Sequence, residues 1–437
     1  MSRTTKTSRS LVVVAVGLSA ALALTGCSSS SASSASQSSV PTHETITFWS
    51  GAAGMNVLVD AFNKTHSDVT VELGAVPGGQ AAYEKIQTAV KAGSGPDVAM
   101  VEYQEIPTLA VAGVLQDVTS ETSGDKSKFQ PAAWNAAGFL GKQYGLPHDI
   151  GPMVMYYNAA LFTKADLPVP KTWDEFQSEG VTLKQKTGAV MGSYLDYGLF
   201  LAAVSAQAGG HWFGTAGNAW QVAINDQASK KALDYWTSLT TSGVAVMDKG
   251  FNAGYWSELD SGKIATYIVG AWGYRGLEGN LKATSGSWRV APVPQWDASH
   301  PVNANIGGSV TAVMKGSKHV KAAVEFARWL TTDPAAFSIA YKSSGFYPAT
   351  VDGAKMTEYD TPDAFFGGQK VGEVYAQAAG QVDTSWQWGP VMTSLNTHLQ
   401  DELPDSVRAR SADSMLDTIQ SQTLSEMKSA GFSVSNG

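Results

Sequence analysis

Strand-like and helix-like patterns of hydrophobic residues alternate from Thr45 onward. Residues 45–49 (TITFW) and 69–76 (VTVELGAV) are rich in β-branched and aromatic side chains, which is typical of strands. Between them, apolar residues recur at i, i+3, i+4 and i+7, the spacing of one helix face, at Met55, Leu58, Val59 and Phe62.

A second helix and a third strand continue this alternation. Tyr83, Ile86 and Val90 align on one helix face that Gly93 is placed to end, and residues 96–101 (PDVAMV) are typical of a strand. This order predicts right-handed crossovers and a parallel sheet. Ligands of such sheets bind beyond the carboxyl ends of the strands. Those ends lie at Trp49-Ser50, Pro77-Gly78-Gly79 and Glu102-Tyr103.

Mixed strand and helix patterns also fill the rest of the chain. Residues 144–158 join a bend with two prolines to a buried-looking strand, and 262–273 (GKIATYIVGAWG) predict a strand that stops at Gly270 and presents Trp272. Further strands are predicted at 288–294 and 309–314, and further helices at 231–243 and 318–332. The chain has 437 residues, which favours two domains over one core.

The N-terminal segment differs from the rest in composition. Arg3, Lys6 and Arg9 precede the apolar run Leu11–Leu24, which is shorter than the about 20 residues of a membrane-spanning helix but fits a secretory signal. The following Leu24-Thr25-Gly26-Cys27 is similar to the bacterial lipobox, which implies cleavage before a lipidated cysteine. An ordinary signal peptide with a chance cysteine is the alternative.

We therefore expect residues 1–26 to be a signal peptide and Cys27, the single cysteine, to carry a lipid. Residues 27–42 would then be a flexible tether, because its serines and alanines cannot form a core. No later segment approaches 18 uninterrupted apolar residues. This predicts a protein anchored by lipid at the extracytoplasmic face of the bacterial cell membrane.

Composition argues against several classes of function. The net charge is −8 and no basic block occurs, which excludes a typical nucleic-acid partner. No H-E-x-x-H, G-x-S-x-G or Walker A motif is present, and the seven histidines lack metal-ligand spacing. We expect no enzyme activity and no cofactor. The distinctive surplus is aromatic, with 13 Trp, 15 Tyr and 15 Phe.

An ordered set of segments resembles the family 1 extracellular solute-binding proteins, the sugar-capturing lipoproteins of bacterial ABC importers. The segments are ITFWSGAAG, SGPDVAMVEY, YGLPHDIGPMVMYYNAALF, KTWDEF, GKIATYIVGAWG and NANIGGSVTAVMKGSKHVKAAVEFARWLTT. The resemblance runs from Thr45 to about Trp388. It implies an α/β, two-lobe periplasmic-binding-protein (Venus-flytrap) architecture with multiple hinge crossings and the ligand enclosed between the lobes.

The resemblance also implies lobe boundaries. By analogy, lobe 1 comprises residues 43–149 and 306–342, and lobe 2 comprises residues 150–305 and 343–437. The crossings would lie near Asp149, Gly307 and Gly345.

A sugar offers an apolar ring face and a rim of hydroxyls, so aromatic side chains and carboxylates are suited to bind it. Trp272 follows a strand end where similar proteins place a sugar-stacking aromatic, and Asp149 resembles the family's hydroxyl acceptor. The candidate ligand-binding residues are Trp272, Asp149, Glu102, Tyr103, Trp49, Trp256, Trp386, Trp388 and Gly308.

Structural roles remain the alternative for each of these candidates. Core packing would explain the tryptophans, and a cap or solvated turn would explain Asp149. A surface loop would explain Glu102 and Tyr103, and hinge geometry would explain the Gly307-Gly308-Ser309 run. Trp212 and His148 are expected to be structural.

The resulting hypothesis is a monomeric receptor that delivers a carbohydrate to ABC permease subunits with a cytoplasmic ATPase. The tryptophan content favours an oligosaccharide. One alternative is another solute: a polyamine would need more clustered acids, and an anion would need cleft cations such as Arg275 or Arg289. Others are a glycoside hydrolase using Glu102 and Asp149, and a surface lectin without a transporter.

Overall fold

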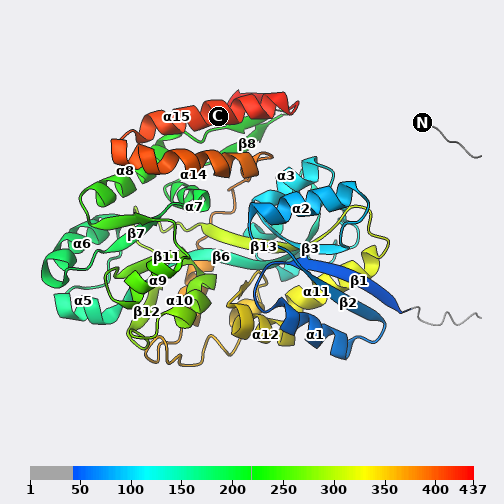
Figure 1. Ribbon diagram of the computed structural model, residues 1–437, viewed down its shortest axis with the longest axis horizontal. Coiled ribbons are helices and arrows are strands. Elements are labelled where there is room, and N and C mark those ends of the chain that lie inside the picture. Colours follow the sequence, from blue (N-terminus) through cyan, green and yellow to red (C-terminus); the bar gives the residue numbers. More distant parts are fainter. Residues whose placement is uncertain (1–42, 218) are drawn as a thin grey trace, which may run out of the picture. The chain divides into compact units, whose positions relative to one another are not determined.

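The computed structural model describes residues 43–217 and 219–437. The predicted signal peptide, the lipidation site Cys27 and the tether lie outside the described residues. Within the described ranges, no helix combines the length and the apolar character needed to cross a membrane. One mixed sheet of eight strands connects the two halves of this part of the chain (Figure 1).

The first half contains the parallel sheet predicted from the N-terminal pattern. Strand β1 (Glu44–Ser50) lies between β2 (Val69–Ala75) and β3 (Val98–Glu102) and runs parallel to both. Helices α1 (Met55–Thr65) and α2 (Gln80–Lys91) form the crossovers. The buried residues of α1 are the four that the spacing predicts, Met55, Leu58, Val59 and Phe62.

Two long antiparallel strands pass from one half into the other. Strand β6 (Gly145–Asn158) pairs through its first part with β13 (Asn305–Val313) and β14 (Tyr347–Pro348). Its second part pairs with β11 (Thr266–Gly270) and β12 (Trp288–Pro292). Strand β6 is buried along nearly its whole length, because elements cover both of its faces.

The second half surrounds that end of the sheet with helices and short strands. Its elements are α5 (Ala159–Ala165), α6 (Trp173–Thr187), β7 (Gly192–Leu195), α7 (Gly198–Gln207), β8 (Phe213–Ala216), β9 (Ala219–Val222), α8 (Gln227–Thr241), β10 (Ala245–Asp248), α9 (Ala253–Asp260), η2 (Ala271–Gly273) and α10 (Tyr274–Asn280). Helix α7 is buried on all sides, which is typical of a helix inside a core.

The remaining elements cover the sheet and join the two halves. They are α3 (Glu105–Val111), η1 (Lys126–Lys128), α4 (Pro131–Ala136), β4 (Gly138–Phe139), β5 (Lys142–Gln143), α11 (Val320–Thr332), α12 (Pro334–Ser344), η3 (Gly353–Lys355), α13 (Gly372–Gly380), α14 (Met392–Ala409), α15 (Ala412–Ser429) and β15 (Val434–Asn436). Figure 1 shows α14 and α15 packed together at the top of the view, over α7 and α8, and α14 also contacts α3 of the first half.

Many of the tryptophans belong to the core of the second half. Trp173 and Trp236 are fully buried and pack edge to face with a centroid distance of 5.7 Å. Trp212 is also buried, and its Nε1 donates to Ser229 Oγ at 2.9 Å, so its expected structural role is confirmed. The aromatic surplus therefore serves packing to a large extent.

A separate hydrophobic core stabilises the first half. Phe326 of α11 packs edge to face with Phe48 of β1 and with Phe62 of α1, at centroid distances of 5.2 and 5.1 Å. All three rings are fully buried. Phe326 thus joins the sheet to the two helices that cover one of its faces.

We predict that Phe326→Ala lowers the free energy of unfolding by about 3–5 kcal/mol, because it removes a buried ring and leaves a cavity among packed neighbours. Urea denaturation followed by circular dichroism measures this change. Val57→Ala, at an exposed position of α1, is the control and should change stability by less than about 0.5 kcal/mol. Equal effects of the two substitutions would contradict this account of the core.

Candidate functional site

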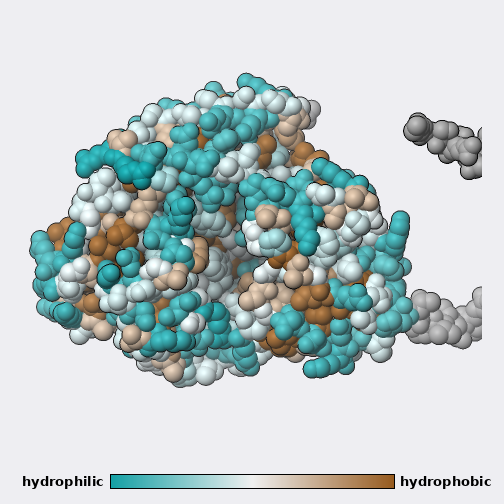
Figure 2. Space-filling view, viewed as in Figure 1, coloured by the Kyte–Doolittle hydropathy of each residue, from teal (hydrophilic) through white to brown (hydrophobic). Residues whose placement is uncertain are grey.

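A cavity of about 550 Å³ lies between the two halves. Figure 2 shows the surface hollowed between them on this face. The first half contributes the start of α2, the end of β3 and the start of α3, and the second half contributes the starts of α7 and η2. Helix α14 closes one side, and β6 and β13 cross at the floor. The cavity therefore lies beyond the carboxyl end of β3, as the parallel-sheet rule predicts.

Glu102 occupies that strand end and lines the cavity. Its Oε2 accepts hydrogen bonds from Tyr83 Oη at 2.9 Å and from Gln104 Nε2 at 2.8 Å. Burial raises the pKa of Glu102, and these two donors oppose part of that rise. The sequence prediction placed Glu102 correctly at a strand end but did not identify Tyr83 or Gln104 as its partners.

Asp149 lies within β6 at the floor of the cavity and is only 3% exposed. Its Oδ1 accepts a hydrogen bond from the Ser309 hydroxyl of the paired strand. Burial raises the pKa of Asp149 to about 7, and the charge of Glu102 adds to the rise. Asp149 is therefore neither a helix cap nor a residue of a solvated turn.

Glu105 is a third carboxylate of the cavity, and the sequence reasoning missed it. It begins α3, and its Oε2 accepts a hydrogen bond of 2.6 Å from the Thr393 hydroxyl of α14. Burial raises the pKa of Glu105 to about 7, with Glu102 adding to the rise. The short Glu102–Glu105 spacing after a strand was the available signal, but the partner on α14 is remote in sequence.

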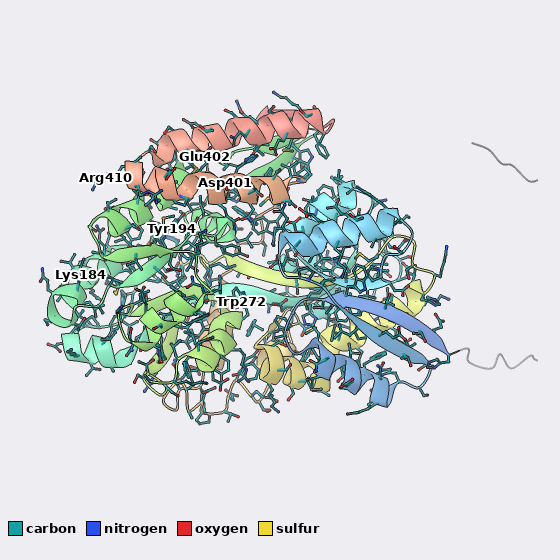
Figure 3. The ribbon with its side chains drawn as sticks, viewed as in Figure 1. Lys184, Tyr194, Trp272, Asp401, Glu402 and Arg410 are labelled. Carbon is teal, nitrogen blue, oxygen red and sulfur yellow. The ribbon has the colours of Figure 1, made fainter. Side chains whose placement is uncertain are left out.

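Trp272 presents an aromatic surface to the same cavity (Figure 3). Its Nε1 donates to the Ile306 carbonyl of β13 at 2.7 Å, which fixes the indole against the crossing strands. A Cβ added at Gly270 would lie 2.4 Å from this nitrogen, so the indole needs glycine there. The glycine at the end of β11 thus leaves the space that the Trp272 indole occupies.

Phe251 completes the aromatic surface and was not predicted. Its ring stacks on Trp272 with a centroid distance of 6.0 Å and an interplanar angle of 28°. It lines the cavity, is 44% exposed and has a φ of 54°, which is uncommon for a residue other than glycine. The available sequence signal was a phenylalanine between Gly250 and Asn252 in a polar loop.

Gly308 and Tyr103 act together beneath the cavity. Gly308 lines the cavity and has a φ of 96°, and a Cβ there would lie 2.6 Å from the Tyr103 ring. Tyr103 is buried, donates to the Asp149 carbonyl at 2.9 Å and lines a small neighbouring cavity. A larger side chain at position 308 would therefore clash with the Tyr103 ring. Tyr103 itself lies under Asp149 and is not part of the lining of the larger cavity.

Four predicted tryptophans lie away from the lining that contains Asp149. Strand alternation directs Trp49 away from the buried face that holds Phe48, and Lys85 Nζ lies 4.8 Å from its ring centroid. Trp256 packs behind Phe251 at 6.4 Å. Trp386 and Trp388 line a different cavity of about 710 Å³. Trp256 is therefore linked to Trp272 only through Phe251, and Trp386 and Trp388 also line the small neighbouring cavity that contains Tyr103.

His148, Arg275 and Arg289, which the sequence analysis also considered, lie outside the cavity lining and contact other parts of the protein. His148 is buried, and burial lowers its pKa to about 4, so its imidazole is neutral at physiological pH. Arg275 donates to the Tyr341 carbonyl at 3.1 Å and pairs with Glu278, while Arg289 donates to the Gly286 carbonyl at 2.9 Å. Neither arginine belongs to the cavity lining.

The cavity thus combines a stacked aromatic pair with three carboxylates. Its described lining contains no lysine, arginine or histidine. Among the described residues, no cluster of three or more histidines, cysteines or acids is arranged to hold a metal ion. The arrangement suits a ligand with an apolar face and several hydrogen-bond donors.

Known proteins are similar to this chain in sequence and in fold. The profile of the family described as bacterial extracellular solute-binding protein matches residues 49–337. An arabinooligosaccharide-binding protein of Bacillus subtilis (strain 168) is 28% identical over 323 residues, which cover 70% of this chain and 72% of that protein. A lactose-binding protein of Rhizobium radiobacter is 25% identical over 408 residues, which cover 88% of this chain and 93% of that protein.

A solved structure is similar over nearly the whole chain. It is the ABC transporter associated binding protein from B. animalis subsp. lactis Bl-04 in complex with β-1,6-galactobiose, with a TM-score of 0.80 and 26% identity. The match covers 90% of this chain and 100% of that one.

The raised pKa of Asp149 predicts a pH-dependent cost to stability. Because the folded pKa lies above the unfolded one, the penalty is absent below about pH 4, grows as pH rises and is complete above about pH 7. Asp149→Asn removes it, so the stability of this variant relative to the unsubstituted protein should increase by about 1–3 kcal/mol between pH 4.5 and pH 8. Urea denaturation at several pH values measures this difference.

Asp60→Asn, at an exposed position of α1, is the matched control for this prediction. Its stability relative to the unsubstituted protein should be nearly constant over the same range. A flat profile for Asp149→Asn as well would show that the buried carboxylate carries no such penalty.

Proposed function

This chain belongs to the bacterial extracellular solute-binding proteins, and from this premise we propose that it binds a carbohydrate between its two halves and delivers it to an ABC importer. The observation that carries the proposal is the meeting of the Phe251–Trp272 stack with Glu102 and Asp149 in one cavity. The rings offer a flat surface for the C–H face of a sugar, and the carboxylates accept hydrogen bonds from its hydroxyls.

The size of the cavity supports an oligosaccharide as the ligand. A volume of about 550 Å³ lies in the middle of the range for small-molecule sites. Two of the similar proteins described above are named for arabinooligosaccharides and lactose, and the solved structure is a complex with β-1,6-galactobiose. Each of these sugars contains more than one ring.

We propose that residues 43–149 with 306–342 and residues 150–305 with 343–437 form the two lobes, which close by a hinge motion. Support comes from β6 and β13, which pass between the halves near Asp149 and Gly307. The third crossing lies at Gly345, which ends α12 with a φ of 76°. Closed-state contacts would include the Glu105–Thr393 hydrogen bond, which joins α3 to α14.

The family is extracellular, and we propose lipid anchoring through Cys27 as the way this member stays at the cell surface. The monomer would dock on permease subunits that a cytoplasmic ATPase drives. Family members and the similar proteins bind solutes for transport, which supports capture without catalysis. Loss of sugar uptake on deletion of the permease would separate this receptor from a surface lectin.

Tryptophan fluorescence of the purified protein, titrated with lactose, β-1,6-galactobiose, maltotriose and arabinooligosaccharides, tests the function. At least one sugar should give a saturable change and be recovered intact by chromatography. At pH 8, Trp272→Ala and Asp149→Ala should each weaken its binding at least tenfold, because they remove the stacking surface and a charged acceptor. Calorimetry then checks the affinities of the variants.

Trp329→Ala is the control, since this partly buried tryptophan packs on Phe62 outside the cavity lining. It should leave the affinity within about twofold while circular dichroism confirms folding of all three variants. Unchanged affinity in folded Trp272→Ala and Asp149→Ala would place the site elsewhere. If no sugar changed the tryptophan fluorescence, the proposed function would be contradicted. Recovery of cleaved sugar would indicate a hydrolase.

A further inference from the structure

The charged side chains that line the cavity are all carboxylates, whereas the other polar side chains of the lining are uncharged amides and hydroxyls. Glu102 and Glu105 each use one carboxylate oxygen, Oε2, for the contacts with Tyr83, Gln104 and Thr393. Their Oε1 atoms have no hydrogen-bond partner within residues 43–217 and 219–437. Both residues line the cavity, so these oxygens are available to a ligand.

Gln104 adds an uncharged acceptor to this set. It is more than nine-tenths buried and lines the cavity, and its Oε1 has no partner among the described residues. A buried carbonyl oxygen without a donor is costly, so a ligand that supplies a donor there is favoured. This is evidence for a bound donor that does not depend on the charges.

The negative charges of Glu102 and Glu105 also affect a residue of the second half of the protein, across the cavity. Tyr197 precedes α7 in the second half, and its pKa is raised well above the ordinary value by burial and then by the charges of Glu102 and Glu105. The Tyr197 phenol therefore stays neutral and can only weakly offset the charge of the acids.

Among the described residues, no lysine, arginine or histidine lines the cavity to balance this negative charge. Lys85 lies over the ring of Trp49 and donates to the Ala75 carbonyl at 3.3 Å, outside the lining. Arg275 is held by Glu278 and the Tyr341 carbonyl. His148, behind the floor, is buried and neutral. A carboxylate on a ligand would thus meet three acids without an opposing charge.

We propose that the cavity selects its sugar by charge: it binds uncharged sugars and sugars with a protonated amine, and it excludes sugars with a carboxylate or sulfate group. The inference rests on the proposed function and narrows its substrate class. The physical reason is that hydroxyl and ammonium groups donate to Glu102, Glu105, Asp149 and Gln104, whereas an anion only repels the carboxylates and satisfies no acceptor.

The test uses lactose and β-1,6-galactobiose, each in four forms that differ only at C6 of the non-reducing ring. These forms carry a hydroxyl, a carboxylate, a carboxamide or an amine. Calorimetry at pH 8 should show the carboxylate form binding at least 100-fold more weakly than its carboxamide isostere, and the amine form binding at least as tightly as the hydroxyl form. The carboxamide controls for size.

Variants and pH separate charge from shape. Glu102→Gln and Glu105→Gln should each reduce the carboxamide-to-carboxylate ratio at least tenfold, whereas Glu325→Gln, at an exposed position of α11, should leave it unchanged. Lowering the pH to 5.5 should also reduce the ratio, because Asp149 and Glu105 gain protons below about pH 7. The pH series needs no substitution, so it distinguishes charge from shape even if a variant fails to fold.

Equal binding of the carboxylate and carboxamide forms would overturn charge selection and leave the carbohydrate function intact. Charge selection would also be overturned if the carboxamide-to-carboxylate ratio of affinities stayed constant with pH and in both Glu→Gln variants, because the discrimination would then be steric. Absence of binding by every form, together with silence across the sugar panel, would overturn the function itself.

Discussion

The antiparallel pairing of β6 with β13 is the constraint on which the site depends. These two strands belong to both halves, and the groups of the floor are fixed to them by hydrogen bonds. Ser309 holds Asp149 across the pair, and the Ile306 carbonyl holds the indole of Trp272. The irregular register around Gly308 gives the strands room to bend over the Tyr103 ring. A site built on shared strands can keep its floor while the walls move with their own halves.

The site also shows how a binding surface costs stability. Three acids line one cavity, and burial raises the pKa of each. Hydroxyl and amide donors from Tyr83, Gln104, Ser309 and Thr393 offset part of that cost without neutralising the charges. An apolar lining would be more stable but would offer no acceptors to a sugar. Because burying these acids raises the free energy of the folded state, their presence in the cavity supports the binding role proposed for it.

Local periodicity predicted the scaffold well, and strand ends predicted part of the site. Strands β1, β2, β3 and β6 and the buried face of α1 follow from residue spacing alone. Glu102 followed from the sheet rule, while the roles of Asp149 and Trp272 came from the family resemblance. Predicting which tryptophans line the cavity was harder, because polar neighbours in the sequence do not reveal whether a ring faces a cavity. Trp49 and Trp256 pack against other side chains, although their surroundings in the sequence resemble those of Trp272.

The sequence by itself determined the first three strands with their two crossover helices, several later strands and helices, and the family resemblance, because side-chain periods of two and 3.6 residues depend only on neighbours along the chain. Only the tertiary structure decided the composition of the cavity. Phe251 meets Trp272 through a loop with an unusual backbone angle, and Thr393 meets Glu105 from a helix at the far end of the chain. Such contacts arise from long-range packing of both halves, which no local spacing encodes.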